Sequence, residues 1–69
     1  MTDYQILLYV RDELLANPYI DAQFVWDAFK LAERNGDMRS LFDRWMISSP
    51  EEKNMVESVM EDLLKVHGV

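Results

Sequence analysis

Apolar residues recur along the chain at spacings of three and four, which is the period of an amphipathic helix. Leu7, Val10 and Leu14 mark one such stripe, and Met60 and Leu64 belong to another. The β-branched residues are scattered and do not alternate with polar residues in the pattern of a strand. The pattern predicts an all-α chain with four helices, at residues of about 3–16, 22–35, 38–46 and 50–66.

Residues that favour the first turn of a helix stand where three of these segments begin. Thr2 is followed three residues later by Gln5, the spacing of a capping box in which each side chain satisfies a backbone N–H group. Asp21, directly before the second segment, is a good N-cap residue. Ser49 and Pro50 pair a capping serine with a proline at the first helical position, where no N–H is needed.

The turn between the second and third segments contains one of only two glycines in the chain. We expect Gly36 to end the second helix in a left-handed conformation and Asp37 to cap the third helix. The third helix is then too short to match the others side by side. The sequence therefore predicts a compact, irregular or orthogonal array of four helices in place of a regular up-and-down bundle.

Composition and charge narrow the class of protein. The 69 residues suffice for a single domain, and the absence of cysteine excludes disulfides and thiolate metal sites. No apolar run approaches the roughly 20 residues that span a bilayer, and the chain does not start with the basic residues of a signal peptide. We therefore expect a soluble, cytoplasmic protein that binds no membrane. Its net charge of -6 also argues against nucleic acid, because the phosphates would repel it.

Side chains that usually carry catalysis are scarce. His67 is the only histidine, and in the last turn of a helix its role is expected to be a favourable interaction with the helix C-terminus. Glu57, Glu61 and Asp62 are expected to share a water-facing side of the fourth helix. The opposite side, expected to face the core, comprises Met55, Val56, Val59, Met60, Leu63, Leu64 and Val66. We predict no catalytic residue, no metal site, no cofactor and no enzymatic activity.

An alternative function rests on the second and third segments, 22–35 and 38–46. Two helices joined by a short glycine turn have the outline of a DNA-binding helix-turn-helix. Arg39, Ser40 and Arg44 would face outward and offer suitable partners for phosphates and guanine. The acidic net charge and Asp43 between the two arginines argue against this hypothesis.

Several large side chains lie off the main apolar stripes. Ile6 and Tyr9 lie off the apolar arc of the first helix, and Trp26 lies at the edge of the second. Tyr and Trp are enriched where proteins bind one another. Arg11 falls inside the apolar arc, where its stem can pack while the guanidinium reaches water, or where it pairs with a carboxylate across an interface.

These observations favour a small acidic, non-enzymatic protein–protein interaction module, acting as a regulator, inhibitor or adaptor. Its general character resembles bacterial or phage-type accessory proteins. The partner surface is predicted to include Ile6, Tyr9, Trp26, Glu57, Glu61 and Asp62. We further expect a homodimer at concentrations on the order of tens of micromolar, formed through Trp26 or through Ile6 and Tyr9.

Overall fold

The computed structural model describes residues 2–69, which form four helices and no strand. The helices are α1 (Asp3–Ala16), α2 (Ala22–Ala32), α3 (Gly36–Ile47) and α4 (Pro50–Val66). The predicted all-α class is confirmed. None of these helices is long and apolar enough to cross a membrane.

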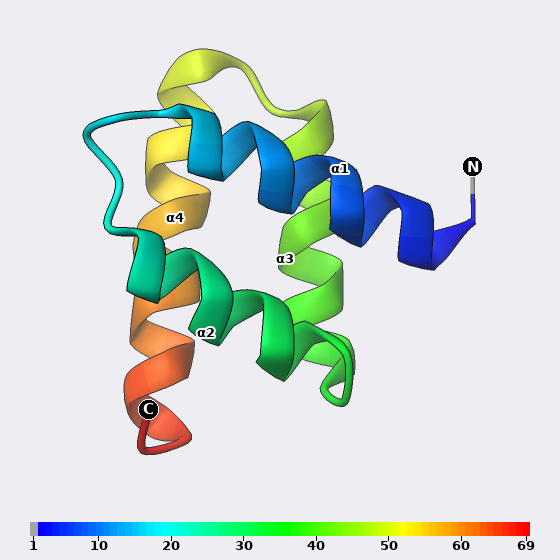
Figure 1. The fold of residues 1–69 in the computed structure, drawn as a ribbon, viewed down its shortest axis with the longest axis vertical. Coiled ribbons are helices and arrows are strands. Elements are labelled where there is room, and N and C mark those ends of the chain that lie inside the picture. Colours follow the sequence, from blue (N-terminus) through cyan, green and yellow to red (C-terminus); the bar gives the residue numbers. More distant parts are fainter. Residues whose placement is uncertain (1) are drawn as a thin grey trace.

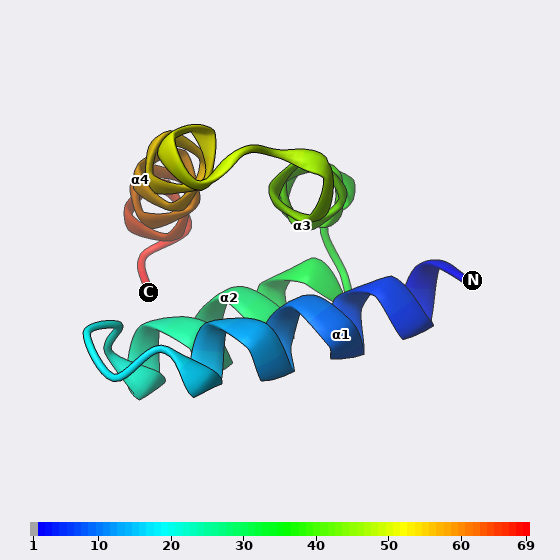
Figure 2. The ribbon, with the colours of Figure 1, turned by 90° about the horizontal axis from the view of Figure 1, so that it is seen from above.

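The helices form two layers that cross each other (Figure 1). α1 and α2 run antiparallel in one layer, and α3 and α4 run antiparallel in the other, as the view from above makes plain (Figure 2). α3 packs against all three other helices, whereas α4 contacts α2 and α3 and makes no contact with α1. This arrangement confirms the predicted orthogonal array.

The predicted caps explain where α1, α2 and α4 begin. The Thr2 hydroxyl accepts a hydrogen bond from the backbone N–H of Gln5 at 3.2 Å, and the Gln5 side chain accepts one from the backbone N–H of Thr2 at 2.9 Å. The Asp21 side chain accepts a hydrogen bond from the backbone N–H of Gln23, and the Ser49 hydroxyl accepts one from the backbone N–H of Glu52, the third residue of α4. Each bond satisfies a backbone donor that the first turn of a helix leaves without a partner.

The turn between α2 and α3 differs from the prediction. Asn35, and not Asp37, caps α3, because its side chain accepts a hydrogen bond from the backbone N–H of Met38 at 3.0 Å. Gly36 is the first residue of α3 and does not have the left-handed conformation that we expected. α2 correspondingly ends at Ala32, earlier than predicted, and α3 gains two residues at its start. Asp37 still contributes there, since a carboxylate in the first turn interacts well with the helix dipole.

All four helices contribute to one core, which comprises Leu7, Val10, Leu14, Val25, Ala28, Phe29, Leu31, Ala32, Met38, Leu41, Phe42, Trp45, Val56, Met60 and Leu64. The side of α4 that is buried in this core is narrower than predicted. Only Val56, Met60 and Leu64 are buried, at a spacing of four. Met55, Val59 and Val66 are 70%, 49% and 79% exposed, so the prediction that they face the core is wrong. α4 lies at the edge of its layer, and its two neighbours cover only one side of it.

Candidate functional site

A groove of about 590 Å³ separates α2 from α4, and we call it the acidic groove. Its apolar lining comes from Ile20, Phe24 and Leu64, which are buried or half-buried. Its carboxylates come from two elements that are distant in sequence, with Asp21 and Asp27 at α2 and Glu57 and Glu61 on α4. Apolar surface and concentrated negative charge therefore meet in one concave site.

The four carboxylates differ in how far they are already engaged. Asp21 caps α2, and Asp27 accepts a hydrogen bond from the Gln23 side chain at 2.9 Å. Glu61 forms a loose ion pair with Lys65, with 3.7 Å between Oε1 and Nζ and both side chains more than 60% exposed. Lys65 is the one cationic side chain in the lining, so the groove keeps a clear excess of negative charge. Residues 2–69 contain no group of acidic or histidine side chains close enough to hold a metal ion.

Glu57 has a structural partner that the sequence pattern did not predict. Its Oε2 accepts a hydrogen bond from the indole Nε1 of Trp45 at 2.8 Å, and Glu57 is half-buried, not fully exposed as we expected. The Nζ of Lys53 lies 4.2 Å from the centre of the same indole ring. Because Trp45 is buried, its N–H needs an acceptor inside the protein. Glu57 therefore supports the junction of α3 and α4 as well as lining the groove.

The other predicted acidic residues separate from one another. Glu61 lines the acidic groove, as described above. Asp62 is exposed, but one step along the helix turns it by about 100° away from Glu61. The predicted acidic face is thus replaced by a groove to which α2 contributes half of the carboxylates. The residues that sequence reasoning missed are Asp21 and Asp27, which are more than 20 positions away from α4 along the chain.

A second, smaller groove of about 230 Å³ lies between α3 and α4, and we call it the apolar groove. Its lining is Leu41, Arg44, Ser48, Glu52, Met55, Val56 and Val59. The two grooves lie on opposite sides of α4, since their α4 residues follow different faces of the helix.

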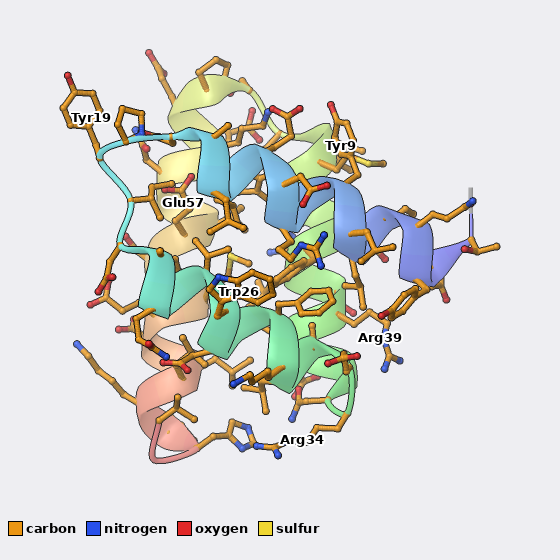
Figure 3. All side chains as sticks on the ribbon, viewed as in Figure 1. Tyr9, Tyr19, Trp26, Arg34, Arg39 and Glu57 are labelled. Atoms are coloured by element: carbon orange, nitrogen blue, oxygen red, sulfur yellow. The ribbon has the colours of Figure 1, made fainter. Side chains whose placement is uncertain are left out.

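The predicted aromatic contact residues do not form a common surface. Trp26, 40% exposed, lies between α1 and α2, whereas Tyr9, 44% exposed, projects from the opposite side of α1 (Figure 3). Ile6 is half-buried and packs against the core. Trp26 also has partners within the molecule, because its ring meets Phe29 edge-on at 6.2 Å.

Arg11 packs against the aromatic rings of Trp26 and Phe29. Its guanidinium carbon lies 5.3 Å from the centre of the Trp26 ring and 5.1 Å from that of Phe29, distances at which a cation is attracted to the ring face. Its side chain is 22% exposed and forms an ion pair with Asp12, the next residue, at 2.8 Å. The expected packing of the arginine stem is therefore combined with a carboxylate from the same helix.

The residues of the helix-turn-helix hypothesis point in different directions. A guanidinium nitrogen of Arg39 donates to the backbone carbonyl of Glu33 at 3.2 Å, at the end of α2. Arg44 lines the apolar groove, and it follows Arg39 by five positions, a separation that places the two arginines about 140° apart around α3. Ser40 is exposed.

His67, expected in the last turn of the fourth helix, lies directly after that turn, at the C-cap of α4. Its Nε2 is 3.3 Å from the side-chain nitrogen of Asn35, so the end of α4 meets the turn that begins α3. This contact is consistent with a structural role.

Comparison with known proteins finds no family model, curated protein or solved structure that matches the chain significantly.

Proposed function

We propose that the protein is a non-enzymatic interaction module that binds a basic segment of another protein in the acidic groove. The observation that carries this proposal is the meeting of Asp21, Asp27, Glu57 and Glu61 around an apolar lining, opposed by the single cation Lys65. A regulator, inhibitor or adaptor acts by occupying such a segment. The protein's acidic character also suits a cytoplasmic accessory protein of bacterial or phage type.

Two physical effects support a basic, partly apolar ligand. The excess negative charge attracts lysine and arginine side chains over several ångströms and speeds the encounter. Ile20 and Phe24 are only half-buried, so an apolar side chain of the ligand gains by covering them. A basic amphipathic helix provides both groups at helical spacing. Because electrostatic attraction is screened by ions, binding should weaken as the salt concentration rises.

A fluorescence titration with a labelled amphipathic peptide tests the proposal. The peptide has about 15 residues, with leucines on one side and lysines and arginines on the other. We expect saturable binding, weakened about tenfold or more by Glu61→Lys, which reverses a charge in the groove. Glu13→Lys is the matched control, because it makes the same charge change on the exposed side of α1.

Two results would contradict the proposal. Equal weakening by Glu61→Lys and Glu13→Lys would mean that the peptide responds to net charge alone. A shift of duplex DNA in a gel that is lost with Arg39→Ala and Arg44→Ala would replace the interaction module by the DNA-binding regulator. Circular dichroism of each variant checks that the helices are kept.

A further inference from the structure

The outer side of α4 next to α3 carries apolar side chains that the rest of residues 2–69 covers only in part. Met55, Val59 and Val66 follow one another at helical spacing and are all about half exposed or more. Leu41 and Val56 form the buried part of the apolar groove beside them. Several large exposed apolar side chains on one side of a helix, in so small a protein, are characteristic of a binding face.

The charges on this face are balanced, unlike those of the acidic groove. The apolar groove contains one cation, Arg44 on α3, and one anion, Glu52 on α4. The ion pairs within residues 2–69 are Arg11–Asp12 and Glu61–Lys65, so neither Arg44 nor Glu52 has an ionic partner among these residues. A strongly basic ligand would find a better site on the other side of α4.

We propose that the apolar groove and the adjoining side of α4 bind a second copy of the chain, in a symmetric homodimer. A twofold axis places the same face on both subunits, and an axis that runs along the groove sets each Arg44 opposite the Glu52 of the second copy. Opposite charges on the two sides of one groove are self-complementary under this symmetry. Met55 and Val59 pack against the matching apolar face of the second copy, and both copies cover surface that is exposed in the monomer.

Size and net charge set the strength of this dimer. The backbone spans only 28 by 27 Å across its broad face, so the contact reaches the roughly 800 Å² per partner of a standard stable interface only if much of that face takes part. Each copy also carries a net charge of -6, which opposes association. We therefore expect a weak dimer, with a Kd on the order of tens of micromolar. The acidic groove lies on the other side of α4 and stays open in both copies.

Sedimentation equilibrium of the full chain, up to about 200 µM, tests the proposal through paired charge reversals. Arg44→Glu and Glu52→Lys should each weaken self-association about tenfold or more, because each places like charges opposite one another. An equimolar mixture of the two variants should form a mixed dimer, since the reversed charges then match. Val59→Asp should abolish the dimer. Glu61→Lys and Glu13→Lys should leave it unchanged, apart from a slight gain from the reduced net charge.

Each other outcome overturns the proposal. A wild-type monomer at about 200 µM excludes the dimer, and if that monomer binds a different protein through Val59, the face belongs to that partner. A dimer that persists with Val59→Asp lies on another surface, and Trp26→Ala then tests the aromatic alternative. Failure of the two charge variants to associate with each other excludes the twofold pairing. Glu52 also contributes to the α4 cap, so thermal unfolding confirms that Glu52→Lys is folded before its association is measured.

Discussion

The two sides of α4 belong to the same helix but have different chemistry. On the side facing α2, Glu57 and Glu61 meet two further carboxylates across a groove. On the side facing α3, Met55 and Val59 leave apolar surface uncovered beside one cation and one anion. Only a narrow stripe between the two sides is buried. A single amphipathic helix can thus hold a charged site and an apolar site apart, provided that a thin stripe is enough to anchor it.

The largest test of this comparison contrasts two methionines of α4. Met60 is fully buried and Met55 is 70% exposed. Met60→Ala should lower the free energy of unfolding by about 2–5 kcal/mol, because it removes buried contacts and leaves a cavity. Met55→Ala should change it by less than about 0.5 kcal/mol. Urea denaturation measures both, and equal losses would show that α4 buries a wider face than the structure describes.

The next test concerns the carboxylate that belongs to both the acidic groove and the α3–α4 junction. Glu57→Ala should destabilise the protein by about 1–3 kcal/mol, because the indole N–H of Trp45 loses its acceptor. Glu57→Gln should cost less, since the amide oxygen can still accept that bond. Glu61→Ala, one turn further along, provides the control and should cost about 0.5 kcal/mol or less. Thermal unfolding monitored by circular dichroism distinguishes the three variants, and an inert Glu57→Ala would contradict the bond.

A smaller effect tests where α3 begins. Asn35→Ala should cost about 1 kcal/mol by removing the cap. Asp37→Ala should cost less, because it removes only a favourable charge in the first turn. Urea unfolding of the two variants shows which of them loses more stability. A larger loss for Asp37→Ala would restore the start of α3 that the sequence suggested.

The smallest expected effect on stability is that of Lys65, the cation of the acidic groove. Lys65→Ala should change the unfolding free energy by about 0.3–0.5 kcal/mol, the usual contribution of an exposed pair one helical turn apart. The same change raises the negative charge of the groove, so the basic peptide should bind a few times more tightly in the fluorescence titration. Weaker binding would show that the groove does not act through its charge.

The sequence predicted the fold well where local chemistry determines it. α1 and α4 have the expected bounds because Thr2 with Gln5, and Ser49 with Pro50, satisfy backbone donors within a few residues. The α2–α3 turn went wrong because Asn35 and Asp37 are both good caps. Because Asn35 lies two positions before Asp37, α3 begins two residues earlier than predicted. Gly36 is then the first residue of α3 and not the residue that ends α2.

The candidate sites were less predictable, because they depend on neighbours that are distant in sequence. Helical periodicity places Val59 in a broad apolar arc, but only the position of α3 decides that this part of the arc stays exposed. In the same way, Glu57 matches a solvated face until Trp45 reaches it from α3. The acidic groove exists because α2 brings Asp27 opposite α4. The spacing of residues within one helix does not predict which residues of another helix will lie opposite it.

The lack of contact between α1 and α4 also bears on how quickly the chain reaches this structure. Every packed pair of helices is adjacent or next but one along the chain, so the two ends need not find each other before the core forms. The connections at 17–21, 33–35 and 48–49 are short, and closing them has a small entropic cost. Topologies dominated by such local encounters fold in microseconds to milliseconds. The time during which the buried stripe of α4, formed by Val56, Met60 and Leu64, is exposed without its neighbours is correspondingly brief.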